Sequence, residues 1–104
     1  MKDLKNSNLL DLYGKTLTDR QYGVMEQYYN LDYSLSEIAE NEAVSRQAVH
    51  DCLRQAQSSL ADLEAKLGFY EKTRKIQIEI ENAKQAKDID ILQEILIKIE
   101  NLIL

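Results

Sequence analysis

The sequence contains no proline, three glycines, one cysteine and one histidine. Proline and glycine mark the turns between strands, so their scarcity argues against a sheet-rich fold. One cysteine excludes an internal disulfide, and Cys52 with His50 supplies too few ligands for a metal site. We therefore expect no metal and no other cofactor. The frequent residues are Leu, Ile, Glu, Gln, Lys and Ala, which favour helices, and the predicted fold class is all-α.

Long apolar runs are also missing. No stretch reaches the roughly 20 apolar residues of a membrane helix, and the N-terminus lacks the continuous apolar region of a signal peptide. We expect a cytoplasmic protein with no membrane partner. The sequence shows no glycine-rich phosphate loop and no nucleophile with an adjacent base. It therefore predicts that the protein is not an enzyme and has no small-molecule substrate.

A strongly basic segment is absent too. The net charge is −5, and residues 1–44 carry four basic and eight acidic side chains, net −4. Residues 45–68 carry three of each sign, and residues 69–104 carry six basic and seven acidic, net −1. DNA-binding domains usually have an excess of Lys and Arg, because phosphate contacts supply much of the affinity. The charge therefore argues against tight, autonomous DNA binding.

Helix-start signals occur three times in the first half of the chain. Thr18, Ser34 and Ser45 are predicted N-caps, and Gln21 and Glu37 follow the first two at the spacing of a capping box. Apolar residues stand at the staple positions around each cap: Leu17 and Tyr22, Tyr33 and Ile38, Val44 and Val49. An earlier helix is predicted to end at Gly14. Three starts, each with more than one signal, support one consistent architecture.

The spacing of the last two starts predicts a helix-turn-helix motif over residues 34–57, inside a domain of residues 1–67. A short helix from Ser34 to Glu42, a turn at residues 41–44 and a longer helix from Ser45 have the required lengths. From Val49 onward, apolar residues recur at intervals of four and three, a heptad stripe: Val49, Leu53, Ala56, Leu60, Leu63, Leu67 and Tyr70. The second helix is predicted to continue to about Leu67, where Gly68 ends or bends it.

Residues 68–104 form a predicted helical extension. One stripe runs through Phe69, Thr73, Ile76, Ile80 and Ala83, and Asp88 is a candidate N-cap for an unusually apolar last helix. The heptad stripe and this helix have two interpretations, an intramolecular hairpin or pairing between chains. The width of the apolar face favours a homodimer or larger assembly. Its predicted interface is Ile91, Leu92, Ile95, Ile99 and Leu102.

Polar residues of the predicted motif are candidates for nucleic-acid binding. Gln47, His50 and Arg54 share the outward face of the second helix, where Gln47 suits adenine and Arg54 suits guanine. Ser36 and Arg46 could hold phosphates, whereas Asp51 on the same face repels them. The alternative is an ordinary solvated face. We weigh the two about evenly, because the motif favours DNA and the charge opposes it.

The stretch from Leu17 to Gln21, the run Tyr33–Glu40 and the run Val44–Val49 resemble region 4 of sigma-70-type factors. More closely, they resemble the YlxM family of small bacterial helix-turn-helix proteins. The resemblance covers most of the chain and is specific over residues 17–60. Relatives tend to have Phe-Gly where this chain has Glu42-Ala43. Glycine in such a turn adopts positive φ, so alanine there costs about 1 kcal/mol.

This resemblance implies a regulatory or DNA-binding protein. Genes of the family commonly lie beside that of the signal recognition particle GTPase, which implies a part in the signal recognition particle pathway. Our first hypothesis is a regulatory protein whose second motif helix enters the DNA major groove. The alternative is a protein-protein interaction module that touches the protein or RNA of the signal recognition particle without autonomous DNA binding.

Overall fold

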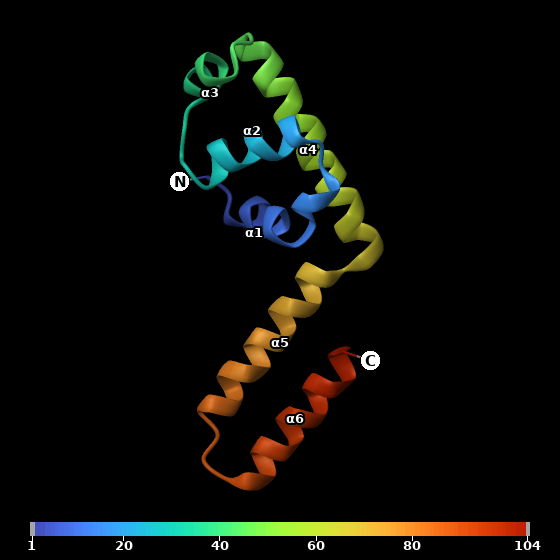
Figure 1. The fold of residues 1–104 in the computed structure, drawn as a ribbon. Coiled ribbons are helices and arrows are strands. Elements are labelled where there is room, and N and C mark those ends of the chain that lie inside the picture. The colour runs from blue at the N-terminus through green and yellow to red at the C-terminus, as the bar shows by residue number, and fades with distance from the viewer. Residues whose placement is uncertain (1, 104) are drawn as a thin grey trace. The chain divides into compact units, whose positions relative to one another are not determined.

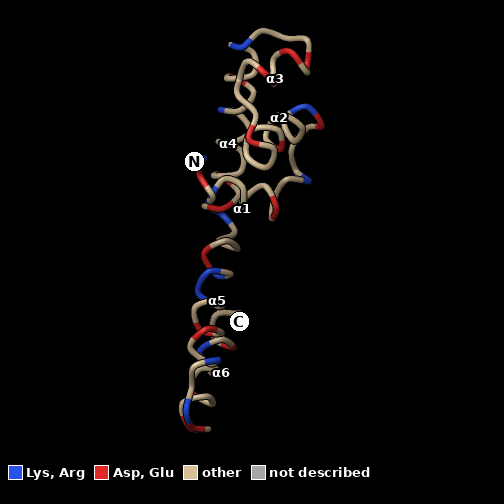
Figure 2. Tube along the Cα trace, turned by 90° about the vertical axis from the view of Figure 1, so that its left-hand side faces the viewer, with Lys and Arg blue, Asp and Glu red and all other residues tan. Residues whose placement is uncertain are grey.

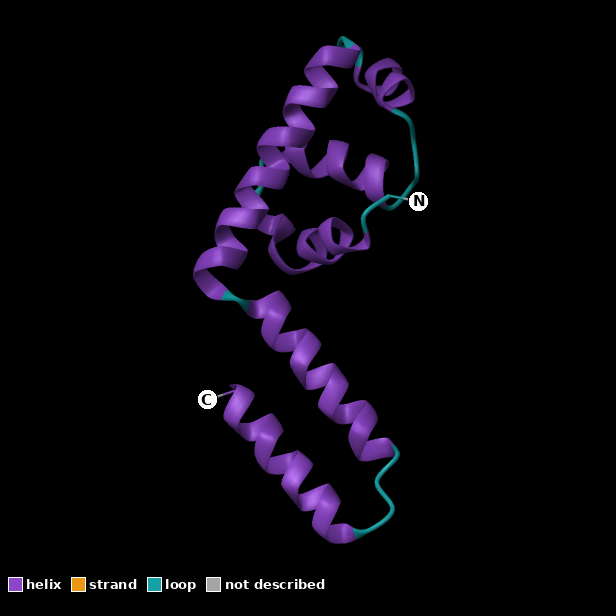
Figure 3. Cartoon of the chain, turned by 180° about the vertical axis from the view of Figure 1, so that it is seen from behind, coloured by secondary structure: helices purple, strands orange, loops and turns teal. Residues whose placement is uncertain are grey.

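The computed structural model describes residues 2–103 and is built from helices (Figure 1). The α-helices are α1 (Leu4–Tyr13), α2 (Asp19–Tyr29), α3 (Leu35–Glu42), α4 (Arg46–Leu67), α5 (Phe69–Lys84) and α6 (Ile89–Ile103), and a 3-10 turn, η1 (Gly14–Thr16), follows α1. Residues 2–103 contain no strand (Figure 3). The all-α fold class is therefore confirmed.

The chain divides into two compact units, residues 1–67 and residues 68–104. In the first unit α4 packs against α1, α2 and α3. The core consists of the buried side chains Leu9, Leu10, Tyr13, Val24, Met25, Ile38, Ala39, Val49, Leu53, Ala56 and Leu60. Four members of the heptad stripe, from Val49 to Leu60, belong to this core. They pack against three short helices of their own unit, so these four residues are not available for either pairing considered for the stripe.

Two glycines stand at helix boundaries and differ in what a larger residue would meet. Gly14 follows α1 as predicted, but its φ of −58° is available to any residue. A Cβ there would lie 2.8 Å from Cε2 of Tyr22, so a larger residue would require the Tyr22 side chain to shift. Gly68 separates α4 from α5 and has a φ of +67°, where glycine avoids the strain of an L side chain. The predicted end of the long helix at Gly68 is observed.

The second unit is an antiparallel hairpin of α5 and α6, which lie side by side (Figures 1 and 3). Asp88 begins α6 as predicted, because its Oδ1 accepts a hydrogen bond of 2.9 Å from the backbone N–H of Ile91. Ile95 is buried between the helices. A hairpin is thus present, but α6 pairs with α5, whereas the sequence interpretation paired it with the heptad stripe of α4. No helix in residues 2–103 is both long enough and apolar enough to span a membrane.

Candidate nucleic-acid interface

The first motif helix, α3, begins with a complete capping box. Ser34 Oγ accepts a hydrogen bond from the backbone N–H of Glu37, and Glu37 Oε1 accepts one from the backbone N–H of Ser34, each 3.1 Å long. Thr18 and Gln21 form the same pair at the start of α2. These bonds satisfy amides that have no partner within the helix. They fix where α3 starts, and so where Ser36, an exposed residue of its first turn, is presented.

Ala43 closes the turn between the motif helices in a left-handed conformation, with φ 55° and ψ 44°. The backbone N–H of Val44 donates to the carbonyl oxygen of Ala39 over 3.1 Å, the long bond of a Schellman motif. The positive φ expected in this turn is therefore present without glycine. The preceding Glu42 is half-buried, and its Oε1 accepts a 3.0 Å hydrogen bond from Nε2 of Gln27 on α2. A polar contact thus stands where the family resemblance led us to expect an aromatic residue.

Ser45 is the N-cap of α4, the second motif helix. Its Oγ accepts a 3.0 Å hydrogen bond from the backbone N–H of Ala48, but the Ala48 side chain has no acceptor for the return bond of a full box. Every predicted nucleic-acid-binding residue is exposed: Ser36 on α3, and Arg46, Gln47, His50 and Arg54 on α4. The buried Val49 and Leu53 hold the opposite side of α4 in the core. The polar face therefore points away from its unit.

Asp51 organises the centre of this face. Its Oδ1 accepts a 2.9 Å hydrogen bond from Nε2 of Gln47 and lies 3.7 Å from Nδ1 of His50. One of the two N–H donors of the Gln47 amide that would pair with a base is thus already engaged. Sequence reasoning placed Asp51 on the face but missed this bond, although its i, i+4 spacing was a usable signal. The guanidinium groups of Arg46 and Arg54 have no hydrogen bond or ion pair with residues 2–103.

The tyrosines of unit 1 take part in packing. The rings of Tyr28 and Tyr29 meet edge to face with centroids 5.0 Å apart, and Lys2 Nζ lies 3.8 Å from the Tyr28 centroid. The Tyr29 hydroxyl accepts a hydrogen bond from Gln57, while burial raises its pKa. Burial likewise raises the pKa of the Cys52 thiol, which lies beside the core. This favours the protonated, weakly reactive thiol. These contacts favour structural roles for both residue types.

Charges of both signs alternate along the trace in Figure 2. The two exposed arginines of α4 are separated in sequence by Asp51, and residues 1–44 add a net charge of −4 to the same unit. No group of three or more His, Cys, Asp or Glu side chains within residues 2–103 could hold a metal ion. On the candidate face, affinity for phosphates therefore rests on Arg46, Arg54 and the amides at the start of α4.

The predicted oligomer interface is divided by the hairpin. Ile95 is buried, and Leu92, Ile99 and Leu102 are half-buried. Ile91 remains 45% exposed and lines a surface hollow among polar side chains, including Glu79, Glu94 and Lys98. The five residues do not share one exposed surface. Several more exposed apolar residues of α6, among them Ile89, Leu96 and Ile103, were not in the predicted set.

Comparison with known proteins identifies one family. The family model described as "Putative helix-turn-helix protein, YlxM / p13 like" (UPF0122) matches residues 1–100. A UPF0122 protein of Clostridium kluyveri is 42% identical over 107 residues, covering 97% of this chain and 94% of the relative. That of Thermoanaerobacter sp. strain X514 is 44% identical over 86 residues, covering 83% and 72%. That of Staphylococcus haemolyticus is 50% identical over 72 residues, covering 69% and 66%.

Proposed function

This chain belongs to the YlxM / p13-like family of helix-turn-helix proteins, and we propose that it is a regulatory protein that binds nucleic acid through the exposed face of α4. One observation carries the proposal. Arg46, Gln47, His50 and Arg54 are all exposed on a helix whose other side is fixed in the core, directly after a capped α3 and a three-residue turn, residues 43–45. This is the arrangement that presents a recognition helix to the major groove.

Each arginine has a distinct role in this proposal. Arg46 is the first residue of α4, where its charge adds to the amides and dipole of the helix N-terminus in holding a phosphate. Arg54 lies two turns further along and is long enough to reach a guanine edge. Asp51 limits the affinity, because its carboxylate repels phosphates and engages the amide of Gln47. The proposal assigns the chain a binding role and no catalytic step.

The test is a salt titration of duplex binding with single substitutions on α4. Because Arg46 neutralises one phosphate in this proposal, the plot of log K against log salt should have a slope of about −1. Arg46→Ala should reduce that slope by about one, and Arg54→Ala should weaken binding by about 1–3 kcal/mol at preferred sequences. If both variants bind duplex DNA as the native chain does, the proposal is wrong.

Asp51→Asn provides the opposite prediction. Removing this charge from the centre of the face should strengthen duplex binding about fivefold at low salt, equivalent to about 1 kcal/mol. Asp62→Asn is the matched control, because Asp62 is an exposed residue of the same helix beyond the candidate face. Both variants change the net charge equally. If the two variants gain equally in duplex affinity, the effect comes from overall charge, and Asp51 does not belong to the interface.

A second candidate is an interaction module of the signal recognition particle machinery, with the same face docking protein or RNA of the particle. The charge favours docking to protein and not to RNA, because residues 1–44 have a net charge of −4 and Asp51 occupies the centre of the face. An acidic surface suits a basic partner better than a phosphate backbone. Capture of the particle by the native chain, together with no duplex binding at low salt, would support this candidate over the first.

A further inference from the structure

The α5–α6 hairpin is poorly stabilised by its own contacts. Ile95 is the one buried side chain among its described residues, 68–103. Isolated helices of this length are marginal in water, and units of fewer than about 40 residues usually need a disulfide, a metal or another chain. The hairpin contains no cysteine, and residues 2–103 hold no metal-binding group of side chains. An additional packing surface is therefore required whenever the hairpin is folded.

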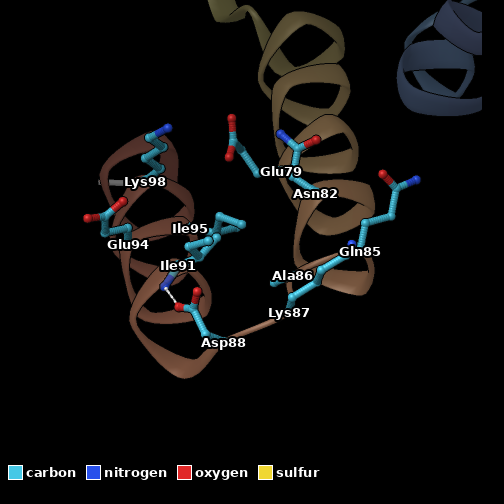
Figure 4. Close-up of a pocket in the computed structure, with 10 residues that line it drawn as sticks. All are labelled: Glu79, Asn82, Gln85, Ala86, Lys87, Asp88, Ile91, Glu94, Ile95 and Lys98. Carbon is cyan, nitrogen blue, oxygen red and sulfur yellow. Dashed lines mark hydrogen bonds between the residues drawn. The ribbon is translucent and has the colours of Figure 1, made fainter.

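One side of the hairpin presents charged and amide side chains from both helices. Surface hollows between the helices are lined by Lys75, Glu79 and Asn82 of α5 and by Glu94, Lys98 and Asn101 of α6, with Ile91, Ile95 and Leu102 of α6 beside them. Figure 4 shows several of these side chains around the hollow near the loop, with Ile95 directed into the space between the helices. Both helices thus turn their polar residues to the same side.

The other side is apolar on α6, and α5 contributes Ile80 to it between the polar residues Gln77 and Lys84. At about 100° per residue, Ile80 lies roughly 140° around α5 from Lys75, and Leu96 lies roughly 160° around α6 from Lys98. On α6 the apolar residues of this side recur at intervals of three and four, a second heptad seam: Ile89, Leu92, Leu96, Ile99 and Ile103. Three of them are largely exposed, Ile89 at 68%, Leu96 at 49% and Ile103 at 62%. We call these five residues together with Ile80 the apolar face.

We propose that the apolar face packs against the same face of a second copy of this chain, forming an antiparallel four-helix bundle. A heptad seam packs against another helix. An apolar face wider than one seam suits a bundle of more than two helices. A second copy is present wherever the chain is made, so it can supply this packing surface whenever the hairpin is folded. In a two-fold symmetric dimer the same surface of each copy forms the interface, so the apolar face alone can cover both hairpins.

The charge of the hairpin favours an antiparallel pair. The end formed by residues 69–76 and 97–103 carries four basic and two acidic side chains, net +2. The loop end, residues 77–96, carries two basic and five acidic side chains, net −3. An antiparallel pair brings unlike ends together, and a parallel pair brings like ends together. The separation between the helices of a bundle is within the Debye length of about 8–10 Å at physiological salt, so this difference affects pairing.

The test is the sedimentation mass of the full-length chain and of two matched variants. The native chain should sediment at twice its 12.0 kDa mass. Ile80→Glu should halve that mass. Ile78→Glu should not, because Ile78 is 53% exposed on the same helix but lies about 160° around it from Ile80. A monomeric native chain, or equal dissociation by the two variants, would overturn the proposal.

Disulfide cross-linking tests the orientation without adding a buried charge. In a Cys52→Ser background, chains carrying Ile89→Cys are mixed with chains carrying Ile103→Cys and oxidised. Antiparallel pairing about Leu96 places residue 89 of one copy near residue 103 of the other. Predominantly mixed disulfides are therefore expected. Cross-links mainly between identical chains, or no cross-link in a mixture of folded chains, would contradict the proposed bundle.

Discussion

Ala43 occupies the left-handed region at the end of α3, with φ 55°. An L residue is disfavoured there by roughly 1–2 kcal/mol, and the turn holds it with hydrogen bonds from the N–H groups of Ala43 and Val44. The sequence could predict this strain, because the length of the turn and the resemblance place a glycine-like conformation at this residue. Predicting the bond between Gln47 and Asp51 needed a choice of side-chain rotamers, which spacing alone does not give.

Replacing Ala43 by glycine should therefore stabilise the protein. We expect Ala43→Gly to raise the free energy of unfolding by about 0.5–1 kcal/mol, because the relief of strain exceeds the greater entropy of glycine in the unfolded chain. Urea denaturation followed by circular dichroism measures it. Ala61→Gly, at an exposed helical position of α4, should have the opposite sign and lower stability by about 0.5–1 kcal/mol. If both variants lose stability, the left-handed conformation of Ala43 is not strained as proposed.

Four helices of this chain begin at the N-cap residues that the sequence predicts. Side chains of Thr18, Ser34, Ser45 and Asp88 each accept a hydrogen bond from a backbone N–H in the first turn of the following helix. These starts were predictable because donor and acceptor are three residues apart. The heptad seam of α6 was harder to predict than these helix starts. The helix is apolar on most sides, and only its packing on α5 shows which of its residues stay exposed.

The cap of α3 should contribute measurably to stability. Ser34→Ala removes the acceptor for the backbone N–H of Glu37 and should lower the free energy of unfolding by about 1 kcal/mol. Ser59→Ala is the control, because Ser59 is exposed in the middle of α4, where alanine is the better helix former. Chemical denaturation of the two variants distinguishes these cases. Equal effects would show that the Ser34 cap contributes little.

On the scale of the whole molecule, the heptad stripe of α4 was the feature that the sequence could not interpret. A stripe shows that a helix buries one side, but it does not identify the neighbour. In the structure α1, α2 and α3 cover Val49 to Leu60, so unit 1 has a core of its own. Unit 2 has one buried side chain among its described residues. The two units therefore differ in how far they can fold alone.

A chain of residues 1–67 should consequently fold by itself. We expect it to remain helical and to unfold cooperatively in a thermal melt followed by circular dichroism, because its core residues are all retained. Leu60→Ala in this shortened chain is the control and should destabilise it by about 2–5 kcal/mol, since Leu60 is fully buried. A broad transition that Leu60→Ala leaves unchanged would show that unit 1 depends on the rest of the chain.

The three successive caps of unit 1 also affect how quickly it folds. Each cap joins residues three apart in the sequence, so a helix start can form before distant parts of the chain meet. Helical domains rich in such short-range contacts fold in microseconds to milliseconds. Rapid folding shortens the time for which the apolar side of α4 is exposed on a newly made chain. The same serines and threonine that mark the helix boundaries therefore also limit the opportunity for aggregation during synthesis.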